Sequence, residues 1–277
     1  MDGLPKAYFL AEKITQKFGQ HLLDQSGILA TPESQSLCVL DNLCGIGIVS
    51  TSLRSALSPQ TRDGLHLTCL DISGPSVKYV KQKGDKEGWK NLQVKVGDAQ
   101  DTQLPSLEYH YVFANIGPTF VKDPAAMMRE CYRMLRARGV VAVSVWKEAG
   151  WWEDMKEAMA SLGDCAPPFP SQEQLVQVHT QDPGWKDPGT ITQTLQGFGF
   201  SDVHVTEKAE QSVLQHVDEY MLMHGMVLGL IMRFWTESQR QELQERASAA
   251  IEKYMRQKYG AGPVTWTWVA FVATGKK

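Results

Sequence analysis

The sequence predicts an α/β protein, built on a mostly parallel β-sheet with helices on both faces. Strand-like and helix-like segments alternate from residue 37 to 146 at intervals of roughly thirty residues, which is the length of a β-α-β unit. Several of the strand-like segments, such as 37–40 and 140–146, are apolar on both faces, as in strands that are covered on both sides. Polar residues directly follow several of these segments, at the carboxyl ends where open α/β sheets bind ligands.

The predicted strands share runs of β-branched, aromatic and other apolar residues bounded by turn residues. They cover residues 37–40, 65–70, 92–96, 109–115, 140–146, 200–207 and 264–275. Right-handed crossovers between the parallel strands bring their carboxyl ends to one edge of the sheet. We therefore expect seven strands and a ligand site at that edge.

The predicted helices lie between these strands, at 48–57, 75–87, 123–139, 190–197, 212–235 and 236–259. The third has the clearest boundaries, since Asp123 is a good N-cap residue and Pro124 suits the first helical position. Gly139 is expected to end it as a C′ glycine. The helix at 212–235 is apolar on all sides, which predicts that it is buried or lies at an interface.

We expect a single domain whose segments have different tasks. These are a helical cap (1–33), a ligand-binding core (34–150), a connector with the sixth strand (151–206), a helical insertion (207–262) and the final strand (263–277). The insertion separates two strands that should be neighbours, so it emerges near an end of the sheet. It is predicted to be a lid with Tyr220, Met223 and His224 as pocket walls; a dimer interface is the alternative.

Composition and charge exclude several classes of protein. A net charge of −3 and a pI of about 6.2 argue against binding to nucleic acid through many phosphates. The N-terminus has no apolar segment typical of a signal peptide, and the longest apolar tract is interrupted by His224 and Arg233. The five cysteines show no metal-binding spacing. We expect a cytoplasmic protein with reduced thiols and no metal or membrane partner, as a monomer or homodimer.

The loop after the first strand contains glycines spaced as in a nucleotide site. Gly45, Gly47 and Ser50 form a degraded version of the dinucleotide pattern, which alone is weak evidence. Asp41 precedes this loop, and a carboxylate there would repel the pyrophosphate of a dinucleotide. S-adenosylmethionine carries an ammonium and a sulfonium but no phosphate, so an acidic loop favours it over a nicotinamide cofactor.

Further polar residues at strand ends fit the same cofactor. Asp71 is placed to accept the ribose hydroxyls, Asp98 to accept the exocyclic amine of adenine, and Asn115 to lie near the methyl donor. The complete predicted set comprises Asp41, Asn42, Gly45, Gly47, Asp71, Ile72, Asp98, Ala99 and Asn115.

Taken together, these motifs resemble class I S-adenosylmethionine-dependent methyltransferases of the UbiE-like branch. The stretches "VFANIGPTFVKDP" and "MMRECYRMLRARGVVAVSVWKE" add to the resemblance, which covers about residues 36–150. Later segments, including "PPFPSQEQL" and "GWKDPGTITQTLQGFGFSDVHV", are similar to fungal secondary-metabolite methyltransferases of the gliotoxin thiomethyltransferase type. The resemblance implies a Rossmann-like seven-stranded fold with a helical lid, and release of S-adenosylhomocysteine.

The resemblance also implies a small hydrophobic acceptor, with a thiol or dithiol as the expected methylated group. Methylation of nitrogen or oxygen remains an alternative, as does a cyclase that keeps the cofactor as a bound cation. A nicotinamide oxidoreductase and a non-catalytic binding protein are weaker alternatives.

One position departs from the family pattern, because Leu43 stands where the broader superfamily has glycine. We expect Leu43 to adopt a right-handed conformation with its side chain turned away from the cofactor. Gly45 and Gly47 remain for the close approach of the backbone to the ligand.

Candidate catalytic residues are Asn115, Trp146 and His224, which follow from position rather than from a motif. Tyr8 and Phe9 are candidates to close over the cofactor from the N-terminal helix. Among the other histidines, His66 and His110 begin strands and should lie opposite the site. His204 should pack within its strand, His21 should lie at the surface, and His179 falls in a segment that could cover substrate.

Overall fold

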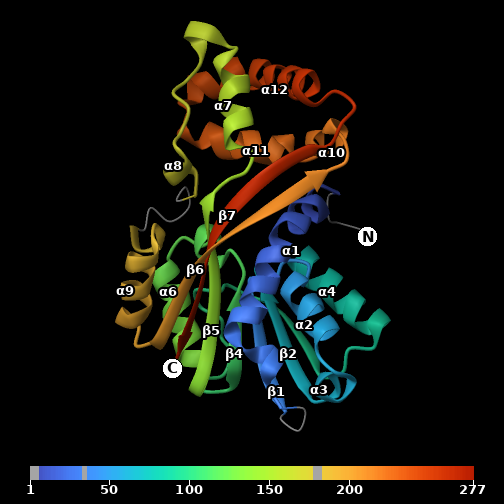
Figure 1. Cartoon of the computed structure of the whole chain (residues 1–277), viewed down its shortest axis with the longest axis vertical. Helices are drawn as coiled ribbons and strands as arrows, with labels where there is room; N and C mark the ends of the chain where they lie inside the picture. Colours follow the sequence, from blue (N-terminus) through green and yellow to red (C-terminus); the bar gives the residue numbers. More distant parts are fainter. Residues whose placement is uncertain (1–5, 33–35, 177–182) are drawn as a thin grey trace.

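A computed structural model of the chain describes residues 6–32, 36–176 and 183–277 (Figure 1). Its centre is a seven-stranded sheet with the order β3-β2-β1-β4-β5-β7-β6. The strands are β1 (Leu37–Asn42), β2 (Leu65–Asp71), β3 (Leu92–Val96), β4 (Tyr109–Ala114), β5 (Leu135–Glu148), β6 (Ser201–Leu214) and β7 (Val264–Lys276). The first five strands run parallel, and β7 is antiparallel to both β5 and β6. The predicted mostly parallel seven-stranded sheet is confirmed.

Helices cover both faces of this sheet and one end of it (Figure 1). Before β5 these are α1 (Lys6–Ser26), η1 (Ile28–Ala30), α2 (Ile48–Ala56), α3 (Pro59–Asp63), α4 (Gly74–Glu87), α5 (Gly117–Phe120) and α6 (Pro124–Met134). After β5 they are α7 (Trp152–Ala160), η2 (Gly163–Cys165), α8 (Gln172–Val176), η3 (Pro183–Trp185), α9 (Pro188–Gly197), α10 (Val217–Met221), α11 (His224–Ile231), η4 (Met232–Phe234) and α12 (Glu237–Tyr259).

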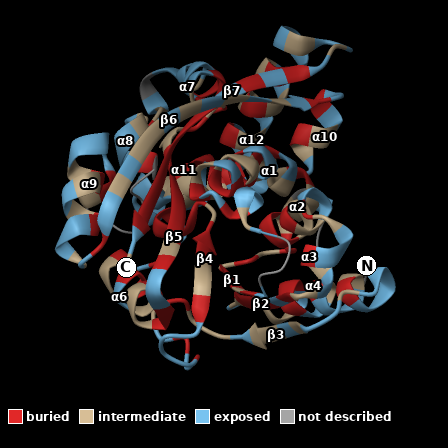
Figure 2. Cartoon of the chain, turned by 60° about the horizontal axis from the view of Figure 1, so that its bottom comes forward, coloured by how far each residue is buried: buried red, intermediate tan, exposed pale blue. Residues whose placement is uncertain are grey.

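The central strands are buried on both faces, which explains their unbroken apolar sequences (Figure 2). In β1, Leu37, Val39 and Leu40 are fully buried, although neighbouring residues of a strand point to opposite faces. Val39 packs with α2 and β2 side chains, whereas Leu40 belongs to the cluster that includes α6. Burial on both faces holds the carboxyl end of β1 in a fixed position at the edge of the sheet.

The boundary between α6 and β5 differs from the prediction. The Asp123 side chain accepts a hydrogen bond from the Ala126 amide, so the predicted N-cap is present. The helix nevertheless ends at Met134, and Leu135 already begins β5. Gly139 is therefore not a helix cap. A Cβ there would lie 2.9 Å from the Arg136 carbonyl oxygen and 3.0 Å from that of Tyr109, so close backbone packing requires glycine.

The sixth strand is longer than predicted, and the insertion correspondingly begins later. β6 pairs with β7 as far as Leu214 opposite Val264, so the helical insertion spans 215–263 rather than 207–262. The predicted helix at 212–235 is three shorter pieces, α10, α11 and η4. With α7 and α12, these pieces form a helical layer beyond the carboxyl ends of the parallel strands (Figure 1).

A buried carboxylate fastens this layer to the sheet. Asp154 in α7 accepts hydrogen bonds from Lys258 Nζ at 2.6 Å, Tyr259 Oη at 2.7 Å and Trp266 Nε1 at 2.7 Å. These donors come from α12 and β7. Because a buried charge is costly unless it is well hydrogen-bonded, the three donors make Asp154 a joint between α7, α12 and the final strand.

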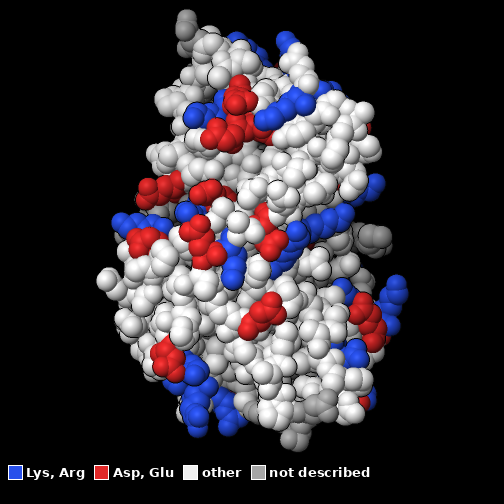
Figure 3. Space-filling model, viewed as in Figure 1, with Lys and Arg blue, Asp and Glu red and all other residues white. Residues whose placement is uncertain are grey.

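The surface carries charges of both signs. On the face shown in Figure 3, lysine and arginine side chains are interspersed with aspartate and glutamate, and broad areas carry neither. Of the helices in the described residues, none combines the length and the hydrophobicity needed to cross a bilayer. The cysteines are free thiols, and Cys165 is exposed.

Candidate active site

The loop between β1 and α2 is held by the carboxylate of Asp41. Asp41 is buried, and its Oδ2 accepts hydrogen bonds from the Ser50 amide at 3.0 Å and the Ser50 hydroxyl at 2.6 Å. Burial raises the pKa of Asp41 to about 7, although the bonds from Ser50 oppose the shift. Asp41 therefore ties the end of β1 to the first turn of α2, which sets the shape of the glycine loop.

The backbone of Leu43 does not behave as expected. Its φ is 57°, which lies in the left-handed region rather than the right-handed one. The residue borders a cavity, and its side chain packs against the buried cluster that includes α6. Gly45 and Gly47 also have positive φ, at 53° and 77°, so the loop turns in the left-handed region at three positions. The backbone path sets this conformation, and glycine elsewhere in the superfamily fits it without the cost of about 1–2 kcal/mol that leucine incurs.

Asp71, at the end of β2, organises the same loop from the next strand. Its Oδ2 accepts a hydrogen bond from the Gly45 amide and its Oδ1 accepts one from the Ser73 amide, both at 2.8 Å. A carboxylate held by two backbone donors has a fixed orientation. Asp71 can therefore present its remaining acceptor capacity to a ligand beside Gly45.

A cavity of about 340 Å³ lies over this loop. It is surrounded by residues from α1, the β1 and β2 ends, α2, the β4 end, α5 and α11. They are Tyr8, Ala11, Glu12, Thr15, Asp41, Leu43, Cys44, Gly45, Ile48, Val49, Asp71, Ile72, Asn115, Ile116, Phe120 and Met226. Three carboxylates line the cavity, and among the described residues no lysine, arginine or histidine does. Its charge suits a cationic ligand.

Glu12, the third carboxylate, was not among the site residues predicted from the sequence. Its Oε1 accepts a hydrogen bond from the Ile46 amide at 2.8 Å, and its carboxyl group covers Gly45, where an added Cβ would lie 2.6 Å from Oε1. Burial raises the pKa of Glu12 to about 8, and nearby Asp41 and Asp71 add to the shift. The helical spacing places four residues of α1 on one face, namely Tyr8, Ala11, Glu12 and Thr15. The signal in the sequence was therefore a carboxylate on a helix face that also carries less polar residues.

Asn115 lines the cavity as predicted, and its side chain also fastens two elements together. Its Nδ2 donates to the Thr15 carbonyl oxygen at 3.1 Å, and its Oδ1 accepts a hydrogen bond from the Ser144 hydroxyl at 2.8 Å. Thr15 belongs to α1 and Ser144 to β5. The amide thus holds α1 against the carboxyl edge of the sheet.

Four of the predicted cofactor-binding residues do not line this cavity. Asn42 is fully buried, with its Nδ2 3.9 Å from Cys131 Sγ, and Gly47 caps α2. The Asp98 carboxylate accepts hydrogen bonds from the amide and the side chain of Gln100, and Ala99 is buried beside it. Asp98 lies after β3, beyond Asp71 along the edge of the sheet. Its contact with adenine stays a prediction.

The predicted pocket walls from the insertion are wrong. Tyr220 and Met223 are buried in the cluster that contains α7, α12 and β7. His224 is hydrogen-bonded to the Met221 carbonyl oxygen and the Ser248 hydroxyl, at 2.8 and 2.9 Å. The insertion reaches the cavity through Met226, which lies on the other side of α11. The catalytic role of His224 stays a prediction, although both of its ring nitrogens are engaged away from the cavity.

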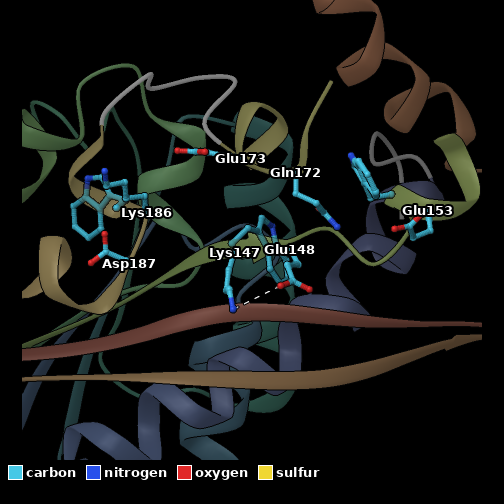
Figure 4. A pocket seen from close by; sticks show the side chains of 10 residues that line it. Lys147, Glu148, Glu153, Gln172, Glu173, Lys186 and Asp187 are labelled. Carbon is cyan, nitrogen blue, oxygen red and sulfur yellow. Dashed lines mark ion pairs between the residues drawn. The ribbon is translucent and has the colours of Figure 1, made fainter. Parts of the chain in front are cut away.

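Trp146 lies outside the cavity over the glycine loop as well. Its ring packs on Phe18 and Trp268, with centroids 4.9 and 5.0 Å apart, so it is an aromatic element of the core. It also borders a second cavity of about 640 Å³ that α7, α8 and the segment before α9 enclose. Figure 4 shows this second cavity, with the ion pair between Lys147 and Glu148 on one wall. A direct role of Trp146 at the transferred methyl group stays a prediction.

The remaining candidates fall in different places. Tyr8 lines the cavity, whereas the ring of Phe9 packs on Tyr79 with centroids 5.3 Å apart. His66 and His110 begin β2 and β4, at the edge opposite the cavity. His204 is exposed on the edge strand β6, contrary to expectation, and His21 is partly buried against Glu210. His179 lies outside the described residues.

The mouth of the cavity is apolar. Ile72, Phe120 and Met226 line it and keep 72%, 56% and 48% of their surface exposed. Large apolar side chains at such exposure often mark a binding surface when they lie together. The arrangement therefore joins an acidic floor, suited to a cation, with an entrance suited to an apolar molecule.

Comparison with known proteins agrees with this geometry. Residues 40–143, which include the glycine loop and Asp71, match the model of the family described as "Methyltransferase domain". The chain is 32% identical over 98% of its length to methyltransferase tpcH of Aspergillus fumigatus, covering 95% of that protein. The chain belongs to the S-adenosylmethionine-dependent methyltransferases. Within this family, it is 34% identical over 92% of its length to the acetylaranotin bis-thiomethyltransferase of Aspergillus terreus, covering 86% of that protein.

The methyltransferase also resembles solved structures in its fold. Phosphoethanolamine N-methyltransferase 2 of Haemonchus contortus, in complex with S-adenosyl-L-methionine, aligns with a TM-score of 0.53 and 17% identity. The alignment covers 94% of this methyltransferase and 52% of that chain. At this identity the similarity concerns the fold, which agrees with the predicted Rossmann-like class I architecture.

The cavity of this methyltransferase fits the family's cofactor. Gly45 and the Glu12 carboxylate lie against each other in its lining, where a side chain at position 45 would meet Glu12 Oε1. Glu12 Oε2 is buried with no hydrogen-bond partner. An orphaned carboxylate oxygen at an acidic loop suits a molecule that brings positive charge and hydrogen-bond donors.

Proposed function

We propose that this methyltransferase binds S-adenosylmethionine in the acidic cavity and methylates the sulfur of a small apolar thiol or dithiol. The observation that carries the proposal is that one cavity is lined by three carboxylates and, at its entrance, by the apolar side chains of Ile72, Phe120 and Met226. The name of the Aspergillus terreus relative, a bis-thiomethyltransferase, supports a thiol acceptor.

In this proposal, chain residues hold the cofactor along the edge of the sheet. Asp71 accepts hydrogen bonds from the ribose hydroxyls, the exposed Ile72 packs against the adenine, and Asp98 accepts from its amine. Gly45 allows close approach of the loop backbone, while Asp41 and Asn115 keep the loop and α1 in place. Bound S-adenosylmethionine supplies an electrophilic methyl group on a sulfonium.

The rest of the chain positions the acceptor and excludes water. Phe120 and Met226 bind its apolar part, which directs its nucleophile toward the methyl group from the side of α11. Orientation of this kind is a large part of catalysis in displacement reactions. A thiol has an ordinary pKa of about 8.5, so it ionises with less assistance than a phenol or an ammonium. This agrees with a cavity whose described lining contains no histidine or lysine.

Incubating the purified protein with S-adenosylmethionine and matched aromatic acceptors, one with a thiol, one with a phenol and one with an amine, tests the proposal. Mass spectrometry would follow S-adenosylhomocysteine and the methylated product. We expect the thiol to be methylated fastest. Turnover confined to the phenol or the amine would assign an O- or N-methyltransferase. Conversion of an acceptor without S-adenosylhomocysteine would assign a cyclase-like reaction. Either result would overturn the thiol assignment.

A further inference from the structure

Glu12 is placed unlike the other two carboxylates of the cavity. Asp41 and Asp71 stand at strand ends and hold the glycine loop through several hydrogen bonds. Glu12 comes from α1, and its carboxylate lies against the loop at Gly45 and Ile46, so that all three acids line the cavity. One of its oxygens accepts the Ile46 amide, while Oε2 is buried and has no hydrogen-bond partner. Burying a polar atom in this way is unfavourable unless something binds to it.

The charges that face Glu12 make this cost larger. Asp41 faces it from the β1 end and Asp71 from the β2 end, and Tyr8 lies one turn away on its own helix. Cys44 of the loop lies close to Tyr8. Lys83 of α4 opposes the rise in the Glu12 pKa as a nearby cation, and it is the last of the main influences on that pKa. Like charges in one small space cannot all ionise easily, so burial and repulsion together keep a proton on Glu12.

A cation in the cavity would reverse this balance. It would attract the carboxylate form, occupy the unpartnered oxygen and relieve the repulsion between the three acids. The proton would then leave as the cation entered. S-adenosylmethionine brings two positive groups, the ammonium of its amino-acid part and its sulfonium.

We propose that Glu12 recognises the positive charge of the cofactor, and that cofactor binding and release of the Glu12 proton are one coupled event. The proposal rests on the proposed function, since it takes S-adenosylmethionine as the ligand of this cavity. It makes α1 part of the binding site, in addition to being a cover for the sheet.

Calorimetry in two buffers of different ionisation enthalpy measures the protons released on binding. We choose pH 7.5, because the pKa of Glu12 is about 8 and that of Asp41 about 7. Glu12 is then mostly protonated before the ligand binds. Net release of protons on binding is expected for the wild type. Binding without proton release would overturn the coupling.

The variant Glu12→Gln keeps the shape and the hydrogen bond from Ile46 but cannot ionise. We expect its affinity for S-adenosylmethionine to fall at least tenfold and its proton release to fall clearly below that of the wild type. The matched control is Asp24→Asn, which removes an exposed carboxylate from the same helix. It should leave both quantities unchanged. Thermal melting of each variant without ligand verifies that it is folded.

S-adenosylhomocysteine separates the two possible positive groups, because it keeps the ammonium and lacks the sulfonium. An equal loss of affinity for both molecules in Glu12→Gln supports recognition of the ammonium; a loss for S-adenosylmethionine alone supports recognition of the sulfonium. Unchanged affinity for both would overturn the proposal while the proposed function stands. Failure of the wild type to bind either molecule would overturn the proposed function.

Discussion

Removing the carboxylate of Asp71 should weaken cofactor binding in two separable ways. In the ligand-free protein it accepts hydrogen bonds from the Gly45 and Ser73 amides, both at 2.8 Å. Hydrogen bonds to a charged group contribute about 1.5–3 kcal/mol each, and partial exposure of Asp71 favours the lower value. Asp71→Ala therefore removes about 3 kcal/mol that stabilises the ordered conformation of the loop. If the cofactor binds only to the ordered loop, its affinity falls about a hundredfold. Lost ribose contacts would add to this.

An analogue cycle distinguishes loop order from ribose recognition. Calorimetry would compare S-adenosylhomocysteine with its 2′-deoxy analogue on the wild type and on Asp71→Ala, with exposed Asp85→Ala as a control. If Asp71 binds the ribose, removing the hydroxyl weakens binding to the wild type about tenfold but hardly affects the variant. An equal effect of the missing hydroxyl in both proteins would refute the ribose contact.

Three further predictions concern the loop, the helical layer and the mouth of the cavity. Leu43→Gly should change cofactor affinity by less than about threefold. The variant no longer has the cost of about 1–2 kcal/mol of leucine at positive φ, and this gain offsets the greater flexibility that glycine gives the unbound loop. A tenfold loss of affinity by calorimetry would contradict this. Asp154→Ala leaves Tyr259 and Trp266 without their acceptor and should lower the free energy of unfolding in urea by about 3–5 kcal/mol. The control is Asp218→Ala, which breaks only the exposed ion pair with Arg256 and should lower it by under about 1 kcal/mol. Similar losses in the two variants would refute the idea of a buried joint. Met226→Ala should raise the KM for the acceptor at least threefold and leave cofactor affinity unchanged. The control is Leu222→Ala, which removes a side chain that is exposed but outside the cavity and should not change the KM. Equal kinetics in the two variants would show that α11 does not contact the acceptor.

Much of the sheet was predictable because its signals are local. The strands β1, β2 and β4 are apolar on both faces, and each is bounded by turn residues, so their positions follow from the sequence. Asp123 and Pro124 identify the start of α6 for the same reason. The end of α6 was not predictable, since Leu135 continues the helical spacing and only its pairing with Tyr109 draws it into the sheet.

The site was predictable where it depends on strand ends and not where it depends on packing across the fold. Asp41 and Asp71 follow directly from the strand positions. Glu12 does not, because its role depends on how α1 lies across the glycine loop, which is a long-range contact. The left-handed φ of Leu43 is similarly set by the backbone path. In the insertion, the sequence indicates an apolar helix but not which face meets the cavity, and so Met226 was overlooked in favour of His224.

The unequal lengths of the last strands bear on how acceptor specificity can diversify. β5 pairs with β7 only as far as Val269, whereas β6 and β7 continue together to Leu214 and Val264. Residues 210–214 of β6 and 264–268 of β7 therefore form a two-stranded arm that carries the insertion. Both ends of the insertion connect to the sheet through this one arm. We therefore expect that replacing residues 215–263 by the corresponding segment of a relative gives the protein the acceptor preference of that relative. Substitutions in the insertion could then change the acceptor during evolution, while the residues of the glycine loop stay the same.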